Sequence, residues 1–218
     1  MKDEAPIFRL RGLGFAYGPG LQVFDGLNFE LRPCERVALT GANGSGKTTL
    51  LHLMMGLVRP QRGVIEAFGA ARSTEAEFFE VRARAGLLFQ DSDDQLFSPT
   101  VIEDVAFGPL NFGKSRKQAR VIALETLSAL GLVELAGRAA HRLSGGQRRL
   151  VALATVLAMK PEALLLDEPS AGLDEPNVER LIEILDRLPQ ARIIISHDAD
   201  FLARTTARRC HLVGRRIA

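Results

Sequence analysis

Cysteine is scarce in this chain, and long apolar stretches are missing. The two cysteines, Cys34 and Cys210, lie far apart without metal-ligand spacing, so they form no metal site and fit a reducing, cytosolic setting. The longest apolar run, Leu150 to Met159, is about half of the roughly 20 residues that a membrane span needs, so the chain does not cross a bilayer by itself. The start, Met1 to Glu4, carries acids without an apolar core, so we expect no secretory signal.

An excess of charge of one sign is also missing. The chain has 28 Lys and Arg against 26 Asp and Glu, a net charge of +2. Composition alone therefore indicates neither a nucleic-acid binder nor an enzyme that acts on acidic substrates. The 218 residues are enough for one large domain or two small ones with a sizeable core.

One glycine-rich stretch carries the clearest functional signal. It follows an apolar run that is typical of a buried strand, Arg36 to Leu39, and precedes a segment that is typical of a helix, Leu50 to Met55. A phosphate-binding loop requires this strand–loop–helix context. A chance glycine-rich turn is the alternative, but so many matching residues in this context argue against it. The stretch consists of Gly41, Ala42, Asn43, Gly44, Ser45, Gly46, Lys47 and Thr48, and Thr49 follows.

The residue types of this loop suit a nucleotide with its magnesium ion. Glycines let backbone N–H groups turn toward phosphate oxygens, and the helix start adds a favourable dipole. Lys47 would reach the β- and γ-phosphates, and the Thr48 hydroxyl would ligate Mg²⁺.

Polar side chains also end three further apolar strands. Asp167 is placed to hold Mg²⁺, and Glu168 can polarise a water for attack on the γ-phosphate; two such acids are costly unless a metal or substrate receives them. At the ligand-binding edge of a parallel sheet, Gln90 could touch Mg²⁺ or the attacking water. His197 could sense the γ-phosphate there. A plain loop glutamine and a structural histidine are the alternatives.

The N-terminal region is predicted to form a small antiparallel sheet. Two apolar-rich strands, Ile7 to Tyr17 and Val23 to Leu31, flank the turn signal Gly18 to Gly20. Tyr17 is the only tyrosine, and its ring could stack on a base. A tyrosine at a sheet edge, without contact to a ligand, is the alternative.

Residues 91–159 are predicted to be largely helical. Helices are expected from Thr100 to Phe107 and from Ser115 to Leu130. Apolar residues beside acids, in Asp93 to Phe97 and in a loop from Phe107 to Gly113, indicate a surface for a partner. The alternative is that these aromatics cover the small core of the helical segment itself.

A second anion site is indicated before the helix predicted from Arg148 to Met159. The residues are Ser144, Gly145, Gly146 and Gln147. Ser144 is a natural N-cap, and the glycines expose N–H groups at a positive helix end. Such a capped helix start is more commonly structural. Further on, Asp174 begins another helix, and the arginines between residues 204 and 216 are interpreted as a solvated or membrane-facing rim.

The order of these motifs resembles the ATPase subunits of ABC transporters over essentially the whole chain. By this resemblance, Tyr17 is the adenine-stacking aromatic, Gln90 the Q-loop glutamine, and Ser144 to Gln147 the signature. Glu168 is then the general base, Asp174 the D-loop aspartate and His197 the switch histidine.

The stretch from Gln90 to Val101, with Phe107 to Asn111, is similar to one subgroup, the ATPases of energy-coupling-factor and cobalt/nickel importers. Ser170 stands where threonine is commoner. The chain also ends without the C-terminal extension of many members, so dimerisation through such an extension is not implied.

The resemblance implies an α/β fold: a P-loop ATPase core with a mostly parallel sheet flanked by helices, a small antiparallel β-subdomain and an inserted helical subdomain. Residues 1–218 would form one ABC ATPase domain. Residues 1–35 and about 60–70 would belong to the β-subdomain, 91–159 to the helical subdomain, and 36–59, 71–90 and 160–218 to the RecA-like core.

The implied function is a motor that binds ATP and Mg²⁺ and drives import of a metal ion such as cobalt or nickel, or of a vitamin. It would close head to tail on a second ATPase subunit, identical or paralogous. Region 91–113 would bind a membrane subunit at the cytoplasmic face of the membrane, without nucleic acid. A soluble ABC-type ATPase acting on DNA or ribosomes and an exporter ATPase are the alternatives.

Overall fold

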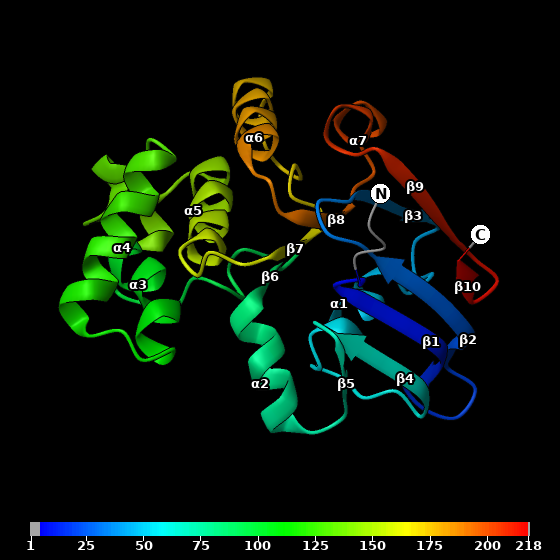
Figure 1. Ribbon diagram of the computed structural model, residues 1–218. Helices are drawn as coiled ribbons and strands as arrows, with labels where there is room; N and C mark the ends of the chain where they lie inside the picture. Colours follow the sequence, from blue (N-terminus) through cyan, green and yellow to red (C-terminus); the bar gives the residue numbers. More distant parts are fainter. Residues whose placement is uncertain (1–4, 218) are drawn as a thin grey trace.

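The structure, a computed structural model, describes residues 5–217, so the expectation about the acidic start concerns residues outside the described part. The strands form two sheets (Figure 1). One has four strands in the order β2-β1-β4-β5, and the other has six in the order β10-β9-β3-β8-β7-β6. Helices α3, α4 and α5 lie to one side, away from the four-stranded sheet. The predicted fold class is confirmed.

The four-stranded sheet is antiparallel and carries a buried face. Phe8 of β1 pairs with Leu31 of β2 on one side and with Ala67 of β4 on the other. These side chains belong to the same buried cluster as Leu50 of α1, so this sheet packs on the nucleotide-loop helix. The strands are β1 (Phe8–Ala16), β2 (Gln22–Leu31), β4 (Arg62–Ala67) and β5 (Ala70–Arg72).

The six-stranded sheet is parallel except for β10. Every residue of β7 and β8 is buried, and this explains the apolar runs at residues 163–166 and 193–195, whereas Arg192 of β8 is a buried polar exception. The carboxyl ends of β3, β6, β7 and β8 therefore meet at one edge. The strands are β3 (Arg36–Gly41), β6 (Ala85–Leu88), β7 (Ala163–Asp167), β8 (Ala191–Ile195), β9 (Arg208–Val213) and β10 (Arg216–Ile217).

The helices divide between the two faces of this sheet. Leu165 of β7 packs in the cluster that includes α1, whereas Leu164 packs in the cluster that includes α3, α4 and α5. The helices are α1 (Lys47–Met54), α2 (Glu75–Arg84), α3 (Val101–Asn111), α4 (Arg116–Ala129), α5 (Gly145–Leu157), α6 (Glu175–Arg187) and α7 (Ala199–Thr205), with short 3-10 turns at Val133–Leu135 and Ala140–Arg142. No helix among residues 5–217 is long and apolar enough to span a bilayer.

Helix α3 is longer than the sequence predicted. The expected loop from Phe107 to Gly113 is helical as far as Asn111, through Pro109. Pro109 removes one intrahelical hydrogen bond, and the helix ends two residues later. Burial of Val105 and Pro109 on the same face continues the contact with the helical core. The prediction of a loop at this place was wrong.

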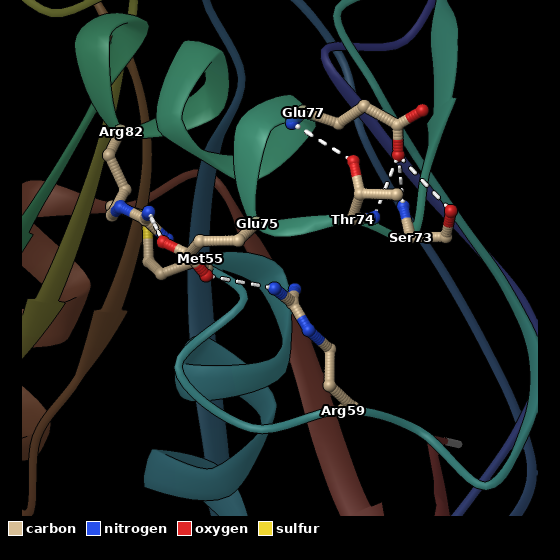
Figure 2. A network of polar contacts seen from close by, with 7 residues as sticks. All are labelled: Met55, Arg59, Ser73, Thr74, Glu75, Glu77 and Arg82. Carbon is tan, nitrogen blue, oxygen red and sulfur yellow. Dashed lines mark hydrogen bonds and ion pairs between the residues drawn. The ribbon is translucent and has the colours of Figure 1, made fainter.

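The start of α2 is fixed by a capping box (Figure 2). The Thr74 hydroxyl accepts the backbone N–H of Glu77 at 3.3 Å. The Glu77 carboxylate in turn accepts the N–H groups of Ser73 and Thr74 at 2.7 and 2.8 Å. Both partners of the box thus satisfy N–H groups that the helix leaves free.

The same helix is tied to the end of α1 through Glu75. Its carboxylate accepts hydrogen bonds from Arg82 and from Arg59, the latter at 3.0 Å. Arg82 also donates to the Met55 carbonyl at 3.2 Å. Figure 2 shows the two arginines reaching the carboxylate from opposite sides, so α2 is anchored on the segment that follows the nucleotide-loop helix.

Removal of this cap should lower stability measurably. We expect Thr74→Ala to reduce the free energy of unfolding by about 1 kcal/mol, because the Glu77 N–H loses its acceptor. Denaturant titration followed by circular dichroism measures the change. Thr74→Ser, which keeps the hydroxyl, is the control; equal midpoints for the alanine and serine variants would contradict the capping role.

Candidate nucleotide-binding site

The phosphate loop has a backbone that requires glycine at two positions. Gly46 has φ 102°, and a Cβ there would lie 2.4 Å from a methyl of Val23. Gly41 has φ 150°, and its Cβ would lie 2.7 Å from the Leu212 carbonyl oxygen. Any side chain would clash at these positions, so the loop keeps its tight path into α1 only with glycine.

Lys47 closes the loop on itself. Its ammonium group donates to the carbonyl oxygens of Gly41 and Ala42 at 2.9 and 3.1 Å. The residue is only 9% exposed. The ammonium group of Lys47 therefore lies within the loop, where its hydrogen bonds could pass from the carbonyl oxygens to phosphate oxygens.

Two oxygen ligands meet where α1 begins and β7 ends. The Thr48 hydroxyl donates to the Asp167 carboxylate at 2.6 Å, although the two residues are 119 positions apart in the chain. Burial raises the pKa of Asp167. Both oxygens line a cavity of about 430 Å³, together with Gln90. Hydroxyl, carboxylate and amide oxygens are hard ligands of the kind that Mg²⁺ takes, so the donor set fits this ion.

Glu168 and His197 are also brought together. The backbone N–H of His197 donates to Oε2 of Glu168 at 3.3 Å, and His197 Nε2 lies 3.5 Å from Oε1. Oε1 is buried and accepts no hydrogen bond from the described residues. Burial raises the pKa of Glu168, while the N–H and the ring of His197 lower it. A buried carboxylate oxygen without a hydrogen-bond donor is costly, so Oε1 marks a place where a ligand or water would supply the missing donor.

Tyr17 lies near Thr49, which follows the phosphate loop. Its side chain is exposed, its hydroxyl is 3.1 Å from that of Thr49, and its ring packs edge-on against Phe15. The tyrosine thus stands beside the first turn of α1 with its side chain more than half exposed, as stacking on a base requires.

The remaining predicted residues lie elsewhere. Ser144 and Gln147 form a capping box at the start of α5, and Asp174 caps α6 by accepting the Asn177 N–H at 3.1 Å. Within residues 5–217, no hydrogen bond joins residues 144–147 to the phosphate loop. Gly145 instead lines a second cavity, of about 180 Å³, beside the loop from Gln90 to Asp93.

Two residues of this region were not predicted from the sequence. His52 lines the larger cavity one helical turn after Thr48, and burial lowers its pKa. Arg149 is 4% exposed and donates to carbonyl oxygens at the ends of β6 and β7. The signal for Arg149 was its spacing, since it occupies the buried stripe of α5 between Gly146 and Leu153.

Comparison with known proteins identifies the family. The ABC transporter profile matches residues 24–171, more than half of the chain. The chain belongs to the ABC transporter family. A putative ABC transporter ATP-binding protein of Nitratidesulfovibrio vulgaris is 52% identical over 201 residues, 92% of this chain and 74% of the relative.

Two further similarities concern proteins named CbiO. The cobalt import ATP-binding protein CbiO of Rhodobacter capsulatus is 43% identical over 202 residues, 91% of this chain and 72% of the relative. The solved structure of cbiO1 from Clostridium perfringens, part of the ABC transporter complex cbiONQ, matches with a TM-score of 0.86 at 32% identity and covers 99% of this chain and 88% of that one. The predicted family and subgroup are confirmed, and this ABC protein is an ATPase.

Proposed function

We propose that this ABC ATPase is the motor subunit that drives import of a small solute, a metal ion such as cobalt or nickel or a vitamin, through a partner membrane protein. It would lie peripherally at the cytoplasmic face of the membrane. The observation that carries the proposal is the meeting of Lys47, the Thr48–Asp167 oxygen pair and the Glu168 carboxylate at one sheet edge. The cobalt-import relative supports the direction of transport.

The chemistry follows from this arrangement. Lys47 would move its hydrogen bonds from its own loop to the β- and γ-phosphates, and Thr48, Asp167 and Gln90 would hold Mg²⁺, which neutralises phosphate charge. Glu168 would take a proton from the attacking water. His197 would orient that carboxylate and contact the γ-phosphate.

A second subunit would complete the site. The signature turn at Ser144 exposes N–H groups at a helix start but faces a different cavity from that of Thr48. We infer a head-to-tail dimer in which Ser144, Gly145, Gly146, Gln147 and Asp174 of one subunit meet the ATP of the other. The γ-phosphate would then bridge both subunits, so that hydrolysis weakens the interface.

The membrane subunit would bind near the segment 91–113 and α2. A groove of about 220 Å³ is lined by Leu57 and Gln95, among other residues. Phe97 and Phe107, both exposed, stack edge to face at 4.8 Å. These apolar groups suit an amphipathic helix, and Asp94, exposed in the same segment, would pair with a basic residue on that helix. Asp93 is a weaker candidate for that contact, because it is paired with Arg148 at 3.0 Å.

Charge reversal tests the docking surface. We expect the Asp93→Lys/Asp94→Lys double variant to lose co-purification with a solubilised membrane subunit, because a basic helix would meet like charges. Glu134→Lys, an exposed acid elsewhere in the helical part, should still co-purify. Intact assembly of the double variant would contradict the docking surface and favour the alternatives that act without this contact.

A further inference from the structure

Arg149 is a buried cation that contacts main chain almost exclusively. It lies on the inner face of α5 and is 4% exposed. Its guanidinium donates to carbonyl oxygens, and its one side-chain acceptor among residues 5–217 is the Ser92 hydroxyl at 3.4 Å. No carboxylate of residues 5–217 forms an ion pair with it. Burial of an unpaired cation costs free energy, and here the hydrogen bonds to the carbonyl oxygens offset that cost.

The carbonyl acceptors belong to two separate strand ends. Nη1 donates to Phe89 at 2.6 Å and to Gln90 at 3.1 Å, just after β6. Nη2 donates to Asp167 and, at 2.6 Å, to Glu168, and Nε donates to Pro169 at 3.3 Å. One side chain of the signature helix thus spans the Gln90 loop and the end of the strand that carries the two acids.

The second of these strand ends has an unfavourable backbone. Glu168 has φ 49°, a left-handed conformation that side chains other than those of Gly, Asn and Asp seldom adopt. It also precedes Pro169, and a residue before proline prefers extended conformations. Such a backbone persists only where its surroundings hold it. The Glu168 N–H donates to Ile195 at 2.9 Å, and Arg149 holds the carbonyl side.

We propose that Arg149 is a positioning residue for ATP hydrolysis: it holds the Asp167–Pro169 backbone in the conformation that directs the Glu168 carboxylate to the attacking water. The same guanidinium links this segment to the Gln90 loop. Because Arg149 belongs to α5, a displacement of α5 would move both segments. The inference rests on the proposed role of Glu168 as the base.

Arg192, on strand β8, is a matched control for Arg149. Arg192 is also fully buried and also donates to backbone carbonyls, those of Leu185, Leu188 and Thr205. None of these three carbonyls belongs to the predicted site. Burial lowers the pKa of both arginines to about 10. Substitution of either by lysine removes a buried planar fork of N–H donors and leaves a single ammonium group in its place.

The first experiment compares kcat and KM of the two lysine variants at equal concentrations of folded protein. We expect R149K to lower kcat about 10²-fold, as small misplacements of catalytic groups do, with KM and the Kd for ATP within about twofold of wild type. R192K should lower the melting temperature but keep kcat. If R149K does not fold, R149Q, which keeps two N–H donors, replaces it. Wild-type kcat in the Arg149 variant, or an equal loss in R192K, would overturn the proposal.

The second experiment asks whether Arg149 acts through Glu168. In the Glu168→Gln background, addition of R149K should lower the residual turnover by less than about threefold, because residues that act as one unit are not additive. A full additional 10²-fold loss would show a general structural effect and would also overturn the proposal. Normal turnover of Glu168→Gln alone would instead remove Glu168 as the base, which is a failure of the proposed function.

Discussion

Replacement of Glu168 by glutamine is expected to slow ATP hydrolysis by about 10²- to 10⁴-fold, the range that general-base removal produces. The amide keeps the size of the side chain but cannot take a proton from water. ATP binding should persist, since the contacts of Lys47 and Thr48 are untouched. Because the γ-phosphate then stays intact, the variant should accumulate as a closed dimer with Mg-ATP.

Phosphate release measures the rate of hydrolysis, and sedimentation velocity with and without Mg-ATP measures the fraction of dimer. Glu134→Gln, an exposed site in a 3-10 turn, is the control and should behave as wild type. Near-normal hydrolysis by Glu168→Gln would remove this carboxylate as the base. Full turnover by a species that stays monomeric with ATP would contradict the shared site.

The pH dependence provides a second readout of the same residue. Burial raises the pKa of Glu168 above its ordinary value of 4.5. A base works only when deprotonated, so kcat should fall as the pH decreases through this raised pKa. In Glu168→Gln the part of the acid limb that belongs to Glu168 should disappear, because the amide does not titrate, and any remaining fall would come from Asp167, whose pKa burial also raises.

Replacement of Lys47 by alanine should weaken ATP binding itself, whereas Glu168→Gln slows hydrolysis of ATP that is already bound. A hydrogen bond to a charged group contributes about 1.5–3 kcal/mol, which is roughly 10- to 150-fold in Kd. Loss of the cation also leaves the phosphate charge uncompensated. The Kd for a fluorescent ATP analogue, measured by titration, should rise by at least this factor.

Lys114→Ala, an exposed lysine before α4, is the control and should bind ATP as wild type does. In the structure Lys47 donates to the carbonyls of its own loop, so the alanine variant should also lose some stability. Unchanged ATP affinity with a folded Lys47→Ala protein would contradict the role of this lysine in phosphate binding.

Local features that repeat a regular pattern were determined by the sequence itself. The phosphate loop was recognisable because glycine is the only residue that fits φ 102° at Gly46 beside Val23. The buried strand before Asp167 was recognisable from its continuous apolar run, and the helix starts at Ser144 and Asp174 from their capping side chains. In each case the cause lies within a few neighbouring residues, so the pattern and the structure agree.

Only the tertiary structure decided which of these features meet. The Thr48–Asp167 hydrogen bond spans 119 positions, and no local pattern specifies such a pair. The carboxylate of Asp93 pairs with Arg148, 55 positions away, and the sequence did not indicate this pair. Helix α3 continues through Pro109 because packing on the helical core outweighs one lost hydrogen bond. Arg149 interrupts an apolar stripe, and its role depends on carbonyls that two distant strand ends bring to it. The sequence thus determined the elements and their chemistry, whereas long-range packing decided the contacts between them, because those depend on surfaces far apart in the chain.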